Sequence, residues 1–557
     1  MLARNIVRSQ CLSSFRRQYA TGISAQQNRK TFKSAETQAK SLGKPTGRLQ
    51  QDPYYLSKKI TKLLNKDSLD EAVTAVKTSP ISLQNEVVWN QLIAKHAKQG
   101  RSGAAFSLVT EVSTAPNTRK SHDAPYADHF LTFQMKRRGF KPTDQTFTSL
   151  LVALSMNPGD NVLQKANDLH TSLSEAGQMS KYHYNSLLQV YARADAHRQM
   201  MRIFNEMKST ATRPDAFTYN IVLNSFARND EGDYNELMEV WWQLQQQVRE
   251  DSERAIGQSK TLSQSSDLKT DHRLLAALLQ GIRRTSTLSK QLYTGIATFD
   301  ELHHLNISGR KSEHPDLNSQ NSLQPNSISF HALLKLLNSA RKFGMADTYI
   351  KSLYDQIDPD TPTINAVIAI RYSQKRYTEA VNLLDTMNDR AMAPNASTFD
   401  MLIRCCGNMY KGRYASDPVV WETMSKVLNR HATEKADRIK KELPLKDLEL
   451  SSKSCTEILR IGRAAAGGTN DITRRREIYN LTVSCIESQR WRRAVSKGWN
   501  ERNDMLAKWM VDAYTVLLDT SDSQPVSKDT LETWRENLEL AEKLVKKQAS
   551  PSSVSRV

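Results

Sequence analysis

The sequence is poor in the residues that build several common classes of protein. Of its 557 residues only five are cysteine, namely Cys11, Cys405, Cys406, Cys455 and Cys485. No two of them form a CxxC pair, so we interpret them as reduced and structural rather than as a disulfide framework. Glycine is scarce, at 20 residues, which favours helices. No apolar run approaches the roughly 18 residues of a membrane span, so no transmembrane helix is expected.

The sequence also lacks the motifs of several enzyme classes. It contains no GxxxxGK[ST] phosphate loop, no GxGxxG after a predicted strand and no HxE…PCxxC deaminase motif. Cys405 and Cys406 have no spaced partner for zinc, and we interpret them as buried thiols. His303 and His304 are adjacent, which does not suit chelation from one face of a helix. We therefore expect no catalytic site, no metal and no cofactor.

Acidic residues are absent from the first 35 positions, which are rich in arginine and serine. Leu2, Ile6, Leu12 and Phe15 can share one side of a helix there. This composition predicts a mitochondrial transit peptide and hence a matrix protein. Arg17-Gln18-Tyr19-Ala20 resembles a matrix-protease site, so we place the cleavage after Tyr19. The alternative is a disordered basic arm.

The whole chain carries a net charge of +19 and has a pI of about 9.5. A basic excess of this size suits a polyanionic partner, because each neutralised phosphate releases a counterion. The alternative is that the charge mainly serves solubility and import.

The most informative pattern is an eight-residue phrase with an aromatic residue and an asparagine at its fourth and fifth positions. It reads Lys181-Tyr-His-Tyr-Asn-Ser-Leu-Leu188, and 35 residues later Ala216-Phe-Thr-Tyr-Asn-Ile-Val-Leu223. Variants of it begin at residues 86, 144, 327, 361 and 396. A fixed interval of this length is typical of stacked helical hairpins.

A second helix is predicted in the same place within each interval. Apolar residues recur there at i, i+3, i+4 and i+7, as in Met200, Ile203, Phe204 and Met207. A proline then ends the interval, followed by Asp, Asn or Thr, as in Pro214-Asp215 and Pro394-Asn395. The proline stops the second helix, and the polar residue can cap the next first helix.

The phrase, its 35-residue interval and the closing proline resemble the P-class pentatricopeptide repeat. The resemblance is clear over residues 144–220 and 327–403 and weak over 51–143. It implies an all-α fold, a right-handed superhelical solenoid of stacked helix-turn-helix repeats that binds RNA. Tetratricopeptide repeats are the close alternative, but their W…LG…Y pattern is not found. The overall layout resembles fungal mitochondrial members, including those that act in small-subunit rRNA maturation.

The departures from a regular array define the expected domain boundaries. They are a transit peptide (1–19), a disordered linker (20–50), degenerate repeats with a loop insertion (51–143), pentatricopeptide repeats (144–249), a flexible insertion (250–270), a degenerate helical repeat (271–307), a second flexible insertion (308–326), further repeats (327–410), a basic helical region (411–545) and a disordered tail (546–557).

The resemblance also implies where RNA binds. In the family, one base is read by repeat position 5 together with the last position, while position 2 clamps bases between repeats. Carried onto this chain, the pairs are Asn90 with Thr143, Asn185 with Asp215, and Asn365 with Asn395, while Asn220 has no clear partner. Asn with Asp favours uracil and Asn with Asn a pyrimidine. At position 2, Tyr182 and Phe217 could sandwich a base; ordinary packing between repeats is the alternative.

These observations lead to one preferred hypothesis and two alternatives. We expect an adaptor in the mitochondrial matrix that binds single-stranded RNA, either mRNA or rRNA, and acts in its maturation, stability or translation. The first alternative is a structural component of the mitochondrial small ribosomal subunit. The second is a tetratricopeptide-like protein scaffold.

Overall fold

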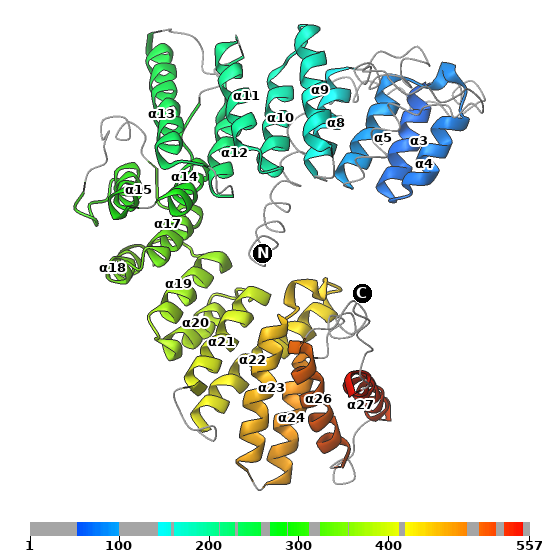
Figure 1. Ribbon diagram of the computed structural model, residues 1–557, viewed down its shortest axis with the longest axis vertical. Coiled ribbons are helices and arrows are strands. Elements are labelled where there is room, and N and C mark those ends of the chain that lie inside the picture. Colours follow the sequence, from blue (N-terminus) through cyan, green and yellow to red (C-terminus); the bar gives the residue numbers. More distant parts are fainter. Residues whose placement is uncertain are drawn as a thin grey trace, which may run out of the picture. The chain divides into compact units, whose positions relative to one another are not determined.

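Every regular element that the computed structural model describes is a helix (Figure 1). The described residues are 53–99, 143–156, 161–210, 212–228, 232–257, 268–286, 288–310, 323–354, 356–411, 418–469, 471–486, 501–519 and 528–549. The predicted transit peptide, the linker, the loop within 113–129 and the last eight residues lie outside them. The predicted all-α class is confirmed for the described part of the chain, and the right hand of the superhelix stays a prediction.

The chain divides into two compact units, Met1–Arg213 and Pro214–Val557. In the first unit, hairpins stack through their first helices: α3 contacts α5, α5 contacts α8, and α8 contacts α10. The helices of this unit are α3 (Pro53–Asn65), α4 (Leu69–Thr78), α5 (Glu86–Lys98), α8 (Asp144–Met156), α9 (Val162–Glu175), α10 (Lys181–Arg193) and α11 (His197–Ser209), with a short 3-10 helix η2 (Ile81–Leu83). The helices α3 and α4 contact each other in the segment where a degenerate repeat is expected before residue 86.

The second unit repeats the same arrangement over more hairpins. Its first helices form a row in which α12, α14, α17, α19 and α21 each contact the next. The helices up to this point are α12 (Ala216–Phe226), α13 (Tyr234–Gly257), α14 (His272–Thr285), α15 (Ser289–Leu302), α17 (Ser327–Ser339), α18 (Phe343–Leu353), α19 (Thr361–Ser373), α20 (Tyr377–Asp389) and α21 (Ala396–Lys411). Each predicted phrase therefore begins a first helix.

The turn inside a hairpin is set by one residue in the left-handed region. Asp195, Arg341 and Lys375 have φ values of 56°, 53° and 62°, and each is the fifteenth residue of its repeat. The next residue donates its backbone N–H to a carbonyl five residues back, as in Lys342 to Leu337 at 3.0 Å. This is the bond that closes a helix end when a left-handed residue follows it. The turn accounts for the fixed phase between the two helices of each repeat.

In the described part of the chain, the polar residue that closes a repeat caps the next first helix in five repeats, whereas the expected cap by Thr143 is not formed. The side chains of Asn85, Asp215, Asn326, Asp360 and Asn395 each accept a bond from a backbone N–H in the first turn of the following helix. An N-terminal cap of this kind stabilises a helix by about 1 kcal/mol. The last repeat position therefore has a structural role in addition to any role in binding.

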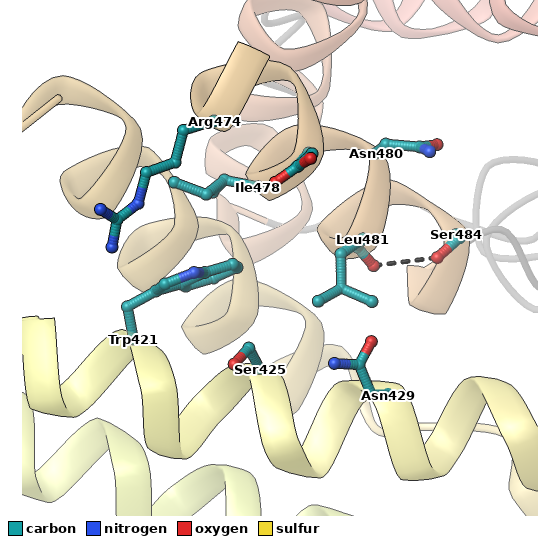
Figure 2. A pocket seen from close by; sticks show the side chains of 9 residues that line it. Trp421, Ser425, Asn429, Arg474, Ile478, Asn480, Leu481 and Ser484 are labelled. Carbon is teal, nitrogen blue, oxygen red and sulfur yellow. Dashed lines mark hydrogen bonds between the residues drawn. The ribbon is translucent and has the colours of Figure 1, made fainter. Parts of the chain in front are cut away.

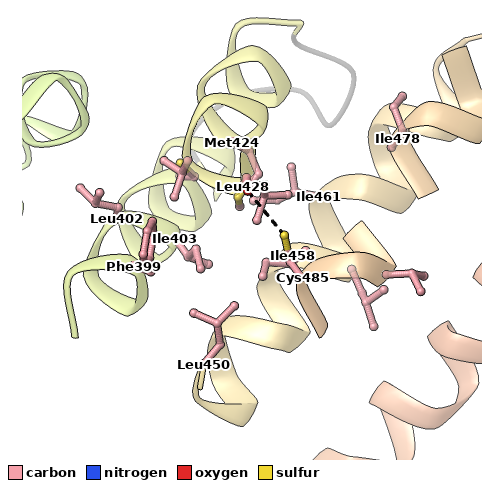
Figure 3. Packing of buried hydrophobic residues seen from close by; sticks show 14 of the residues in the cluster. Phe399, Leu402, Ile403, Met424, Leu428, Leu450, Ile458, Ile461, Ile478 and Cys485 are labelled. Atoms are coloured by element: carbon pink, nitrogen blue, oxygen red, sulfur yellow. Dashed lines mark hydrogen bonds between the residues drawn. The ribbon is translucent and has the colours of Figure 1, made fainter. Parts of the chain in front are cut away.

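The stack continues beyond residue 411, although the sequence interval fades there. The later elements are α22 (Pro418–Lys440), η3 (Leu445–Leu448), α23 (Ser452–Gly467), α24 (Ile472–Ile486), α26 (Glu501–Asp519) and α27 (Lys528–Ala549). α23 contacts α21 as the next first helix, and α24 contacts α22 as the next second helix. Figure 3 shows Phe399, Leu402 and Ile403 of α21 on the same core as Ile458 and Ile461 of α23. This region is thus a continuation of the repeat architecture.

The predicted flexible insertion at 250–270 is partly ordered. α13 continues to Gly257, because the chain keeps good helix formers past Val248. At the other end Leu268 is buried and Thr270 bonds to Gln245 of α13 at 3.1 Å. Residues 258–267 lie outside the described part. The ends of the insertion are therefore fixed to the hairpins.

Candidate nucleic-acid interface

The candidate interface is the row of first helices within each unit. Because these helices contact one another in order, equivalent positions on them recur at regular steps. Positions 2 and 5 lie in the first two turns of a first helix, and the capping residue of the next helix lies beside them in the stack. The predicted RNA-binding residues all belong to these three positions.

Asn365 and Asn395 are brought together in the second unit. The Asn365 Nδ2 donates to Asn395 Oδ1 at 3.4 Å, and both side chains are half-buried. Thr398, one turn into α21, donates its hydroxyl to Asn365 Oδ1 at 2.8 Å. Its backbone N–H donates to Asn395 Oδ1 at 3.0 Å. The two amides are thus held by one threonine and by each other.

These bonds decide which polar groups the pair can offer a ligand. Both amide oxygens accept bonds within the protein, whereas the Asn395 Nδ2 donates none among the described residues. An amide nitrogen carries two hydrogens, so Asn365 retains one as well. The pair therefore presents N–H donors, and it fits a base edge that offers acceptors.

Asn90 and Thr143 are brought together in the same way in the first unit, across the predicted loop insertion. Asn90 Nδ2 donates to Thr143 Oγ1 at 3.1 Å, and the Thr146 hydroxyl donates to Asn90 Oδ1 at 2.7 Å. Asn90 is only 4% exposed, however. This pair offers a ligand much less surface than Asn365 and Asn395.

The pairing of Asn185 with Asp215 stays a prediction, because Asn185 belongs to the first unit and Asp215 to the second. Asn185 is 5% exposed on α10, and Asp215 caps α12 through Thr218, whose backbone N–H donates at 2.9 Å. The proposed sandwich of Tyr182 and Phe217 spans the same boundary and also stays a prediction.

Asn220 has a candidate partner that the sequence did not reveal. α14 follows α12 in the row of first helices, and Asp271 caps α14 by accepting from the Leu274 N–H at 2.8 Å. Asp271 thus occupies the place of a closing residue for the repeat that contains Asn220. Asn224 bonds to Asn220 Oδ1 at 2.9 Å. The signal that could have identified Asp271 is an aspartate directly before the apolar run of residues 274–279.

Position 2 carries large apolar side chains that the fold leaves exposed. Val87 is 55% exposed, Tyr182 52% and Ile328 42%. Most other apolar side chains on the same helices are buried, so the exposure of these three is specific to position 2. Of the three, only Tyr182 has an aromatic ring, and stacking of such a ring on a base contributes about 1–3 kcal/mol.

The row of first helices in the second unit also carries basic side chains. Withdrawal from solvent and then the charge of Arg283 lower the pKa of Lys335. Neither residue forms an ion pair with an acid among the described residues. Arg404 of α21 lies over the ring of Tyr372, 6.0 Å from its centre. A phosphate would relieve the repulsion between Arg283 and Lys335.

The position-5 residue of α17 is His331. Burial and then the neighbouring Lys335 lower its pKa to about 4. The imidazole is therefore neutral at physiological pH, and it adds no positive charge to the row.

A separate pocket of about 420 Å³ lies between the second helices α22 and α24 (Figure 2). Trp421, Asn429, Arg474 and Asn480 line it, and Figure 2 shows the Arg474 side chain extending toward the Trp421 ring. The neighbouring Arg475 donates to the carbonyls of Ala466 and Thr469, so its role is structural. The basic segment 490–499 lies outside the described part of the chain.

The described residues contain no group of three His, Cys, Asp or Glu side chains that could hold a metal ion. Burial raises the pKa of the Cys405 and Cys485 thiols to about 12, so they stay protonated. Within the same residues no helix is long and apolar enough to cross a bilayer.

The comparisons with known proteins agree with the hairpin architecture. The model of the PPR repeat family matches residues 180–228 and 359–408, which include α10 and α19. A search of curated proteins gave no match. Among solved structures, the chain is similar to the pentatricopeptide repeat protein PPR10 from maize, with 17% identity and a TM-score of 0.39, over 90% of this chain and 69% of that chain.

A second similar structure is PPR10 in complex with an 18-nt psaJ RNA element, at 14% identity and a TM-score of 0.41. The alignment covers 90% of this chain and 62% of that one, so the chain spans less than two thirds of its length. The two matched segments lie within the repeated helical hairpins, so residues 180–228 and 359–408 are repeats of the PPR family.

Proposed function

We propose that the protein binds single-stranded RNA along its rows of first helices. The observation that carries this proposal is the arrangement of Asn365, Asn395 and Thr398, in which two neighbouring amides turn N–H donors away from their internal bonds. Amides at a regular step can meet the edges of successive unpaired bases, because those edges carry matching donors and acceptors. The match of residues 180–228 and 359–408 to the PPR repeat family supports the proposal.

The bases and the backbone contribute in different ways. Asn365 with Asn395 favours a pyrimidine, and Asn185 with Asp215 is expected to favour uracil. Few repeats have a complete pair, so phosphate contacts from basic residues such as Arg283 and Lys335 supply much of the affinity. Binding is therefore expected to weaken steeply as salt rises.

The cellular role follows from the sequence. The acid-free, arginine-rich first 35 residues support import into the mitochondrial matrix. There the protein acts as an adaptor that binds a transcript and affects its maturation, stability or translation, with small-subunit rRNA as a candidate target. We propose no enzymatic step, because the repeats provide binding surfaces rather than a catalytic centre.

The binding proposal is tested with the full chain and a pool of single-stranded RNAs of random sequence. The expected result is retention of RNA, enriched in pyrimidines, that is lost as salt rises. Asn365→Ala should weaken binding, whereas Asn388→Ala should not, since Asn388 is an exposed residue on the second helix α20. Equal losses in the two variants, or no binding by the wild type, would contradict the proposal and favour a protein scaffold.

The cellular role is tested in mitochondria by crosslinking and sequencing the bound RNA. Crosslinks to one transcript or rRNA segment with free sedimentation of the protein support an adaptor. Co-sedimentation with the small ribosomal subunit at high salt would instead support a structural component. Deleting residues 1–19 should abolish import, and a cytosolic wild-type protein would refute the location.

A further inference from the structure

We propose that Thr398 is a positioning residue that determines base specificity. It fixes the orientation of the Asn365 amide and thereby selects the base that this amide binds. This inference deepens the proposed function and rests on it. Thr398 is the third residue of the repeat that follows the one containing Asn365, and it is fully buried, so it does not itself reach a base. Its effect on RNA therefore passes through Asn365.

The geometry of the contact shows how Thr398 acts. Its hydroxyl has one hydrogen, and the shortest of its bonds is the one to Asn365 Oδ1, at 2.8 Å. The Thr398 Oγ1 itself accepts the Asn395 backbone N–H at 3.2 Å, which fixes the direction in which the hydroxyl can donate. A donor aimed at Oδ1 holds the Asn365 oxygen inward and leaves an Nδ2 hydrogen for the ligand.

The orientation matters because the two pyrimidines differ on this edge. Cytosine offers two neighbouring acceptors, O2 and N3, whereas uracil offers an N–H at N3. A pair that presents only donors therefore favours cytosine over uracil. Without the hydroxyl, the Asn365 amide can turn and offer its oxygen to the uracil N3–H, so the preference should fall.

The contact recurs where the surrounding residues allow it. In the first unit Thr146, also the third residue of the following repeat, donates to Asn90 Oδ1 at 2.7 Å. Where position 5 is His331 instead, the equivalent Thr363 hydroxyl has two acceptors for its one hydrogen, Asp360 Oδ1 at 2.6 Å and the Ser327 carbonyl at 3.2 Å. The threonine thus engages the position-5 side chain in the pairs that contain Asn90 and Asn365.

The contrast between these threonines provides a matched control. Thr398→Val keeps the size of the side chain and removes the hydroxyl, and Thr398→Ser keeps the hydroxyl. Thr363→Val removes a hydroxyl that makes a comparable capping contact but does not touch Asn365. Thermal melting of each full-length variant shows whether the fold is retained, and Thr398→Ala replaces Thr398→Val if the valine variant does not fold.

The measurement is the ratio of affinities for short oligo(C) and oligo(U), by fluorescence anisotropy at one fixed salt concentration. One hydrogen bond of ordinary strength corresponds to a change of about fivefold, so Thr398→Val should move the ratio toward oligo(U) by roughly that factor. Thr398→Ser and Thr363→Val should keep the wild-type ratio.

The outcomes separate the inference from the proposed function. If the wild type binds both oligonucleotides and Thr398→Val leaves their ratio unchanged, the inference is overturned and RNA binding stands. An equal change in Thr363→Val would also overturn it, because the effect would then come from a lost cap. If the wild type binds neither oligonucleotide, the proposed function fails and the inference fails with it.

Discussion

Asn395 combines two roles that a pair of substitutions can separate. Its Oδ1 accepts the Thr398 backbone N–H at 3.0 Å and so caps α21, while its Nδ2 remains for a ligand. Asn326 caps α17 in the same manner, accepting from the Ile328 and Ser329 N–H groups at 3.1 Å. On α14, the first helix before α17 in the row, position 5 is Ala276, whose side chain has no hydrogen-bonding group for a base. Asn326 is therefore a structural match for Asn395 without the proposed contact.

We expect Asn395→Ala and Asn326→Ala to lower the free energy of unfolding by similar amounts, about 1 kcal/mol each, because each removes one helix cap. Only Asn395→Ala should weaken RNA binding in addition, by roughly fivefold for the loss of one hydrogen bond. Asn395→Asp should keep the cap, since a carboxylate oxygen can accept the same N–H, and should shift base preference toward uracil.

Stability is measured by thermal unfolding and binding by anisotropy with a pyrimidine oligonucleotide, using the same protein preparations. The reasoning is refuted if Asn395→Ala weakens RNA binding no more than Asn326→Ala does. In that case the closing residue would serve only as a helix cap.

Three further predictions concern the second unit. Tyr349→Phe should lower the free energy of unfolding by about 2 kcal/mol in urea titrations, because the Tyr349 hydroxyl donates at 2.6 Å to the buried Asp300 carboxylate. A smaller loss in an Asp300→Asn background would confirm the coupling between the two side chains. Burial lowers the pKa of His303 to about 4, so between pH 6.5 and 4 only the unfolded state binds a proton there. The free energy of unfolding should therefore fall by about 2 kcal/mol from pH 7 to pH 5, and it should fall less in His303→Gln. Lys335→Gln should reduce the slope of log affinity against log salt by about 1, and an unchanged slope would exclude a phosphate contact there.

The regular part of the fold could be predicted from the sequence because each feature has a local cause. The apolar spacing of Met200, Ile203 and Phe204 fixes the second helix, and Pro394 with Asn395 fixes where one helix ends and the next is capped. These are interactions between near neighbours, so they leave a pattern in one short stretch of chain.

The hairpins after residue 411 were not predicted as repeats, because they pack on the stack without containing the eight-residue phrase. α22 is 23 residues long, so the next first helix, α23, starts later than the 35-residue interval requires. Leu448, Leu450 and Ile458 still bury apolar surface against α21 and α22. The stack depends on apolar faces that match, and such faces can be supplied at irregular intervals.

The candidate site was predictable by position but not by environment. The sequence placed Asn365 beside Asn395, and the structure joins them. It gave no sign that Asn90 and Asn185 are nearly fully buried, or that Thr398 reaches back across a repeat. Burial and such contacts depend on how two helices face each other in the stack, which no single repeat encodes.

The long insertion between α13 and α14 has a consequence for how this protein can change. α14 lies directly between α12 and α17 in the row, although α13 ends at Gly257 and α14 begins only at His272. Such a connection can lengthen or shorten over generations without altering the step from one helix to its neighbour. A nucleotide footprint on this protein should accordingly be counted in helices, and a homologue with a different loop length should protect the same number of bases.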